Sequence, residues 1–232
     1  MEQKRKAAAN PANGYREIER RKLVIVYPNG YGLVRFKMLI EVTEADFSGP
    51  YHYFGISDDV AASTGIPRID DLRLGTLLDV GYRPFINYHL TSPTQEDSGI
   101  VAKEVPSESD SRLRMVQFRI NRPCPVGQMI SYAWEWGLPR LFNVEQGACD
   151  TSSYKALRPC EHFANEIHFV HPQEGRRVEF KSEPVLHANR TSTGEQYRLE
   201  ATGFSTLDYL SYRWDLGRIA SLDEYIVRWC NK

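Results

Sequence analysis

Cysteine is scarce in this sequence, with four residues in a chain of 232. That number is too small for the disulfide framework of a small secreted domain, so we expect reduced thiols. No window approaches the ~18 consecutive apolar residues of a membrane span. The basic cluster near the first residue has no apolar stretch behind it, unlike a secretory signal. Together these absences predict a cytoplasmic protein without a membrane partner.

A basic excess is also lacking. Lys and Arg number 29 against 30 Asp and Glu, which gives a net charge of -1. Proteins that bind nucleic acid depend on positive charge to neutralise phosphates, so we expect no nucleic-acid partner. The hydrophobic fraction of 41% and charged fraction of 25% are typical of a globular chain.

Sequence motifs of catalysis and cofactor binding are missing as well. The chain has no P-loop, no Gly-x-Gly-x-x-Gly turn and no Gly-x-Ser-x-Gly nucleophile elbow. The adjacent acids Asp58-Asp59 and Asp70-Asp71 would face opposite sides of a strand, so neither pair forms a ready catalytic dyad. We therefore predict no cofactor and assign no catalytic residue.

Metal binding stays open as an alternative. Potential ligands gather within 23 residues, namely Cys149, Cys160, His162, His168 and His171. Zinc prefers four nitrogen or sulfur ligands, but paired Cys-x-x-Cys or His-Glu-x-x-His spacing is absent. Half-buried thiols and surface histidines explain the cluster more simply, so we predict no metal site.

The chain alternates between apolar and polar residues over many short runs. Residues 23–27 and 33–42 are rich in β-branched and aromatic side chains, and Pro28-Asn29-Gly30 between them predicts a β-hairpin. Period-two alternation recurs at 114–120, 130–136 and 210–215. One buried and one wet face are typical of antiparallel sheets. We predict an all-β fold of one or two immunoglobulin-like antiparallel β-sandwich units.

Aromatic residues occupy one face of two of these runs. Tyr132, Trp134 and Trp136 share a face of the first, and Tyr212 and Trp214 repeat the pattern. We predict that these rings form the core between two sheets, because each buries about 150–250 Å². The opposite face, which carries Glu135, Arg213 and Asp215, should then be solvated.

One helix is expected, at the C-terminus. Ser221 and Glu224 have the spacing of a capping box, in which each side chain satisfies a free backbone N–H group. One helical face would then carry Leu222, Tyr225, Ile226 and Trp229. We predict a short helix over residues 218–232.

Charge and composition suggest four segments. Residues 1–14 form a flexible basic arm, and residues 15–141 form a first β unit that contains a long acidic insertion at 44–110. Residues 142–217 form a second β unit, followed by the predicted helix. Long insertions in compact domains are commonly functional. We predict that Arg68, Asp70, Asp71 and Arg73, set among aliphatic residues of this insertion, bind a protein partner.

A resemblance adds a biological context. The resemblance rests on six segments, namely Phe118-Arg119-Ile120, Arg122-Pro123, Pro125-Val126-Gly127-Gln128, residues 130–136, residues 166–172 and Tyr212-Arg213-Trp214. This order of strands and turns resembles uncharacterised bacterial β-sandwich domains that accompany signalling or defence effectors, over residues 15–217. The resemblance implies an accessory or sensing role in a bacterial cytoplasm, and no site residues.

The sequence therefore predicts a non-enzymatic accessory module that binds a protein partner. Two alternatives stay open. The chain could sense a small ligand, either nucleotide-like or a metabolite, in a pocket between sheets or under residues 44–110. It could also be a metal-dependent hydrolase built on the Cys/His cluster or the Asp pairs.

Overall fold

The computed structural model describes residues 14–55, 73–75, 100–105, 113–120, 123–172 and 175–232. These residues form fourteen strands and no helix. The strands are β1 (Tyr15–Val26), β2 (Gly32–Val42), β3 (Tyr51–Gly55), β4 (Arg73–Gly75), β5 (Ile100–Val105), β6 (Leu113–Ile120), β7 (Met129–Leu138), β8 (Cys149–Lys155), β9 (Cys160–Val170), β10 (Phe180–Arg190), β11 (Glu195–Leu199), β12 (Thr202–Ser205), β13 (Tyr209–Ile219) and β14 (Glu224–Asn231).

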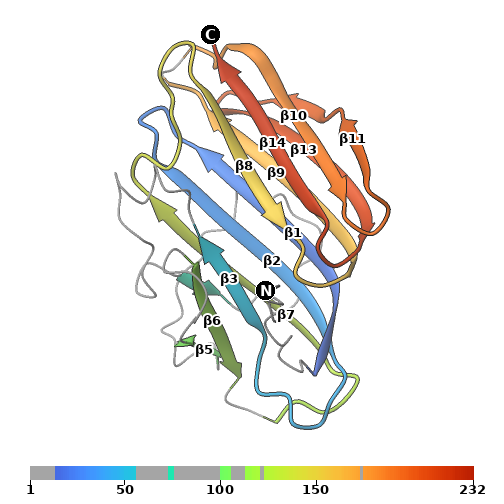
Figure 1. The fold of residues 1–232 in the computed structure, drawn as a ribbon. Helices are drawn as coiled ribbons and strands as arrows, with labels where there is room; N and C mark the ends of the chain where they lie inside the picture. The colour runs from blue at the N-terminus through green and yellow to red at the C-terminus, as the bar shows by residue number, and fades with distance from the viewer. Residues whose placement is uncertain (1–13, 56–72, 76–99, 106–112, 121–122, 173–174) are drawn as a thin grey trace, which may run out of the picture.

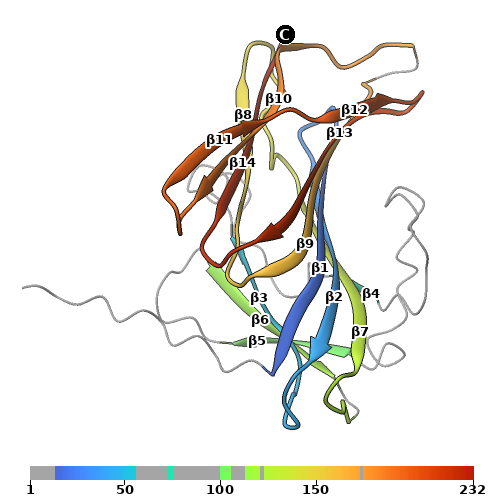
Figure 2. The same ribbon diagram turned by 90° about the vertical axis from the view of Figure 1, so that its right-hand side faces the viewer.

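The strands form one large sheet and two smaller ones. The seven-stranded sheet has the order β12-β13-β9-β1-β2-β7-β4, the four-stranded sheet β11-β10-β14-β8, and the three-stranded sheet β3-β6-β5. Figures 1 and 2 show both smaller sheets on the same side of the large one. The all-β part of the predicted fold class is consistent with these sheets, which pack in layers.

The centre of the large sheet is the predicted hairpin. β1 and β2 pair antiparallel from Tyr15↔Val42 to Val26↔Gly32. The turn contains Gly30 at φ 79°, where a Cβ would also meet the carbonyl oxygen of Phe142 at 2.8 Å. Glycine suits both demands because it has no side chain.

A parallel pair joins the two halves of the large sheet. β1 pairs with β9 in parallel register, from Glu17↔Cys160 to Val26↔Phe169. The prediction of purely antiparallel units is therefore wrong for this sheet. Strands from residues 15–141 and from 142–217 meet in it, and alternation within single strands carries no information about such pairing.

The predicted aromatic core is confirmed. Tyr132, Trp134 and Trp136 of β7 and Tyr212 and Trp214 of β13 are all buried. The Trp134 ring stacks on Phe36 of β2 at 4.5 Å and meets Phe118 of β6 edge-on at 6.1 Å. Phe36 also lies 6.1 Å from Tyr154 of β8. These contacts link the inner face of the large sheet to both smaller sheets.

The prediction of a C-terminal helix is wrong, because residues 224–231 form strand β14. Tyr225, Val227 and Trp229 alternate inward, each at 1% exposure, and Ile226 and Arg228 lie on the other face. Tyr225 and Trp229 are four residues apart, which fits both a helical face and a strand face. Ser221 caps no helix; its hydroxyl donates to the carbonyl oxygen of Leu157 at 2.9 Å.

Two of the four cysteines are not reduced. Cys149 and Cys230 face each other across β8 and β14 and form a disulfide, while Cys124 and Cys160 are free and buried. The expectation of reduced thiols is therefore wrong for this pair. Disulfides persist mainly in oxidising compartments, which weighs against the cytoplasmic prediction; the compartment itself stays a prediction.

Several predictions fall outside the described residues. These include most of the basic arm (1–14) and much of the acidic insertion (44–110). Within the described part of the chain, no helix has the length and apolarity needed to cross a membrane.

Candidate functional site

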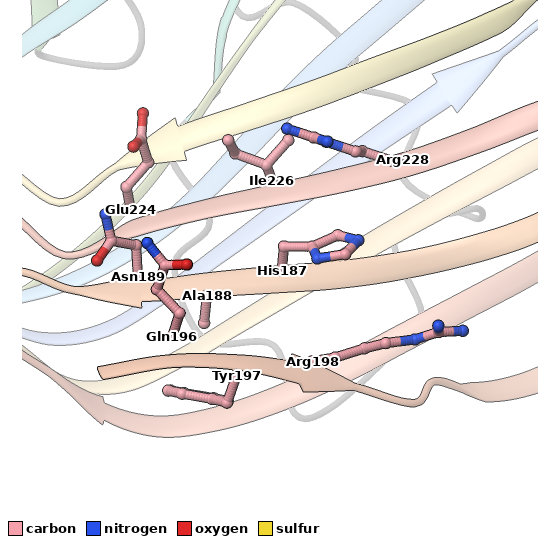
Figure 3. Close-up of a pocket in the computed structure, with 9 residues that line it drawn as sticks. All are labelled: His187, Ala188, Asn189, Gln196, Tyr197, Arg198, Glu224, Ile226 and Arg228. Atoms are coloured by element: carbon pink, nitrogen blue, oxygen red, sulfur yellow. The ribbon is translucent and has the colours of Figure 1, made fainter. Parts of the chain in front are cut away.

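The outer face of the four-stranded sheet carries an open depression of about 440 Å³. It crosses three neighbouring strands, β11, β10 and β14. Outward-facing side chains around it come from Gln196, Arg198, His187, Asn189, Glu224, Ile226 and Arg228, as Figure 3 shows. We call this depression the β10 basin.

The strand register places these side chains in rows. Arg198 lies opposite His187, and His187 lies opposite Ile226. In the next row Asn189 lies between Gln196 and Glu224. Cross-strand partners stand about 4.5–5.5 Å apart at Cβ, so each row is a continuous line of contacts.

Charge is unevenly distributed over the β10 basin. Figure 3 shows Glu224, Asn189 and Gln196 together at one end, and Arg198 and His187 toward the other. Arg228 and Arg198 are exposed, and among the described residues neither has an ion pair or a side-chain hydrogen bond. The basin therefore presents two uncompensated guanidinium groups to solvent.

A second polar group lies inside the molecule, between β1 and β8. Arg20 donates to Glu17 at 2.5 Å and to the hydroxyl of Tyr154, and the Arg20 side chain is only 8% exposed. Burial raises the pKa of Glu17, against the attraction of Arg20. Burial opposes the charge of Arg20, but Glu17 and nearby tyrosines raise its pKa above the ordinary range.

Lys22 neighbours this pair on the same inner face. Its Nζ donates to Ser152 Oγ at 2.9 Å and to the Ser153 carbonyl oxygen at 2.7 Å. Burial lowers the pKa of Lys22 to about 7. A serine beside a near-neutral lysine has the composition of a catalytic dyad. However, both side chains are buried, and the second bond ties Lys22 to the edge of β8.

Two histidines are buried among the described residues, His52 and His168, and each contacts another side chain. His52 Nε2 lies 2.5 Å from Tyr132 Oη, and burial lowers the pKa of His52 well below its usual value. His168 Nε2 lies 2.5 Å from Glu166 Oε1, and its ring stacks on Tyr209 at 4.8 Å. Ser211 lies opposite His168, and its buried Oγ has no hydrogen-bond partner among the residues that the structure describes.

The structure separates the members of the sequence-predicted Cys/His cluster. Cys149 is in the disulfide, and the Cys160 thiol donates to the carbonyl oxygen of His162 at 3.3 Å. Burial raises the pKa of Cys160 to about 11, which disfavours the thiolate that a metal needs. Within the described residues, no group of three or more His, Cys, Asp or Glu side chains is arranged to hold a metal ion.

Most of the predicted partner-binding surface lies outside the residues that the structure describes. Arg68, Asp70 and Asp71 lie outside the described residues. Arg73 begins β4, the edge strand of the large sheet, opposite Glu135 of β7. That surface stays a prediction.

Sequence reasoning did not find the β10 basin. The alternation of Arg198 with Gln196 and of His187 with Asn189 is visible in the sequence. Because 38 residues separate Asn189 from Arg228, the sequence does not indicate that β14 pairs with β10.

Comparisons with known proteins show the fold alone. No protein-family model and no curated protein matches the chain. The crystal structure of a "putative protease" from Parabacteroides distasonis is similar at a TM-score of 0.50 and 11% identity. The alignment covers 93% of this chain but only 40% of that one.

Two further solved structures are less similar. A serine-rich repeat adhesion glycoprotein from Streptococcus agalactiae has a TM-score of 0.25 at 8% identity, covering 92% of this chain and 88% of that one. The yeast delta-COP-I mu-homology domain, complexed with a WxWxV peptide, has a TM-score of 0.21 at 9% identity, with coverages of 95% and 75%. Neither value indicates a shared fold.

Proposed function

We propose that this chain is a non-enzymatic accessory module that binds a protein partner through the outer face of its four-stranded sheet. The observation that carries the proposal is the β10 basin, an open surface of exposed and half-buried side chains on a sheet whose opposite face packs against the core. Leu186 and Val227 on that inner face are 0% and 1% exposed. A rigid sheet is a suitable support for recognition because it fixes the side chains on it.

The buried polar groups support binding rather than catalysis. Lys22, Arg20 and His52 each contact a partner that holds strands together, and all three are less than 9% exposed. A catalytic group must reach its substrate. The resemblance to domains that accompany bacterial signalling or defence effectors supports placing the module in such a system.

Site-specific photo-crosslinking in the natural host tests this function. A photoreactive residue replaces Gln196, which is exposed in the β10 basin, or Arg218, which is exposed on β13. We expect a discrete protein adduct from position 196 only, and its loss when Ile226→Trp fills the basin. Equal adducts from both positions, or none from position 196, would contradict the proposal.

A small-ligand sensor is the second candidate. A volume of about 440 Å³ lies within the range of ligand pockets, roughly 300–1,000 Å³. Such pockets normally enclose their ligand, whereas the β10 basin is open. Thermal-shift screening with nucleotides and metabolites separates the two candidates: a rise in melting temperature that Ile226→Trp abolishes would favour the sensor.

A further inference from the structure

Arg198 and Arg228 differ from several arginines on the strands that have carboxylate partners. Arg16 pairs with Glu41 and Glu161, and Arg213 pairs with Asp215 at 2.8 Å. Further pairs join Arg21 to Glu19, Arg35 to Glu135 and Arg190 to Glu195. In contrast, Arg198 and Arg228 have no such partner among the described residues and belong to one depression. A guanidinium group is a fixed fork of donors that matches a carboxylate.

The spacing of the two arginines indicates the size of the ligand. β11 and β14 flank β10, so the strands that carry Arg198 and Arg228 lie about 10 Å apart, two strand spacings. The arginines are also offset by two residues along β10, because Arg198 lies opposite His187 and Arg228 opposite Val185. Figure 3 shows the two side chains on opposite sides of His187. One small anion would occupy a single guanidinium group. A segment that crosses the basin could place one acidic group on each.

The other end of the β10 basin sets a limit on charge. Glu224 lies in the row with the amides Asn189 and Gln196. Along β14, Glu224 is four residues from Arg228, which corresponds to about 13 Å in a strand. The amides accept and donate hydrogen bonds, so this end suits a neutral polar part of a ligand. The carboxylate of Glu224 would repel a further carboxylate there.

We propose that the β10 basin binds an extended acidic segment of a protein partner, with one carboxylate on Arg198 and a second on Arg228, across His187. This rests on the proposed protein-binding function and names the partner's chemistry. Extended segments repeat a side chain on one face every 6–7 Å or so, and carboxylates two or four positions apart span the required distance. Complementary charge provides register and selectivity.

Fluorescence anisotropy on the full chain tests the proposal. The probe is a fluorescein-labelled ten-residue peptide of alternating Glu and Thr, and the control probe has Gln for Glu. We expect the Glu probe to bind at micromolar to submillimolar concentration and the Gln probe at least tenfold more weakly. No detectable binding of the Glu probe at 1 mM, or equal binding of both probes, overturns the proposal.

Charge-reversal variants locate the binding. Arg198→Glu with Arg228→Glu should weaken the Glu probe at least tenfold. The matched control reverses Arg218 and Arg177, which are also exposed but lie outside the β10 basin; its affinity should stay within twofold of wild type. Glu224→Gln should strengthen binding by about two- to fivefold. Equal loss in both double variants would show nonspecific charge attraction and refute the site.

Inorganic phosphate distinguishes the extended segment from a simple anion. At 10 mM and matched ionic strength, phosphate should displace less than half of the bound probe. Full displacement would show a single-anion site and overturn the two-carboxylate geometry. The photo-crosslinking experiment tests the proposed function separately. An adduct at position 196 that persists in the Arg198→Glu and Arg228→Glu double variant would retain the proposed function and refute this inference.

Discussion

Lys22 Nζ lies 2.7 Å from the carbonyl oxygen of Ser153, on the edge of β8 that has no neighbouring strand in its sheet. A second bond to Ser152 Oγ fixes the ammonium there. Sheet edges expose unpaired backbone groups, and a buried edge needs another partner for them. Lys22 supplies that partner and so joins β1 of the large sheet to the four-stranded sheet.

The Lys22 contact predicts a dependence of stability on pH. Burial lowers the pKa of Lys22 to about 7, from an ordinary value of 10.5. Below pH 7 the amine is charged in both states, and the cost of burying the charge is present in full. Between the two pKa values the unfolded chain binds more protons, so stability rises with pH.

We expect the free energy of unfolding to rise from pH 7 to 9 by at most about 1.4 kcal/mol per pH unit. Lys22→Met should remove most of this rise. Lys37→Met is the comparison and should remove a smaller part, because burial also lowers the pKa of Lys37 but that side chain remains partly exposed. Urea unfolding at several pH values measures the effect. The same slope in Lys22→Met as in wild type would contradict the assignment.

Glu17 and Arg20 predict a strongly non-additive pair of substitutions. Their side chains are 1% and 8% exposed, and a single substitution leaves a buried charge without its counter-ion. Arg20→Met should therefore cost about 3–5 kcal/mol. Replacing both, with Glu17→Leu and Arg20→Met, should recover most of that loss. Urea denaturation of the two single variants and the double variant checks this, and additive losses would contradict it.

The strands and the core could be predicted from the sequence because they depend on local alternation. The β1–β2 hairpin needs only two apolar runs and the Pro28-Asn29-Gly30 turn. The inward direction of Trp134 and Trp214 follows from the period of two. The inward direction of these aromatic side chains therefore required no knowledge of the partner strands.

The same reasoning failed where the environment comes from distant strands. Glu135 was expected in solvent, but it is 4% exposed and forms an ion pair at 2.6 Å with Arg35. The parallel β1–β9 pair and the approach of β14 to β10 both depend on sheet order. Since alternation does not encode sheet order, the β10 basin could not be assembled from the sequence.

The disulfide predicts both a thiol count and a loss of stability. Under denaturing, non-reducing conditions a thiol reagent should detect two thiols, Cys124 and Cys160, and four after reduction. The bond closes a loop with a sequence separation of 81, so the chain-entropy model gives a loss of up to about 4.5 kcal/mol on removal. Cys149→Ser with Cys230→Ser should melt at lower temperature and no longer respond to reductant. Four free thiols before reduction would refute the bond.

Ile226 and Val227 distinguish the observed strand from the helix that the spacing suggested. In β14, Val227 is 1% exposed in the core and Ile226 faces the β10 basin. On the helical face defined by Leu222, Tyr225 and Trp229, Ile226 would be buried instead. A buried carboxylate without a partner is among the most destabilising substitutions. We expect Val227→Asp to cost more than about 3 kcal/mol and Ile226→Asp less than about 1 kcal/mol. Chemical denaturation of both variants measures the difference, and the reverse order would restore the helix and remove Ile226 from the basin.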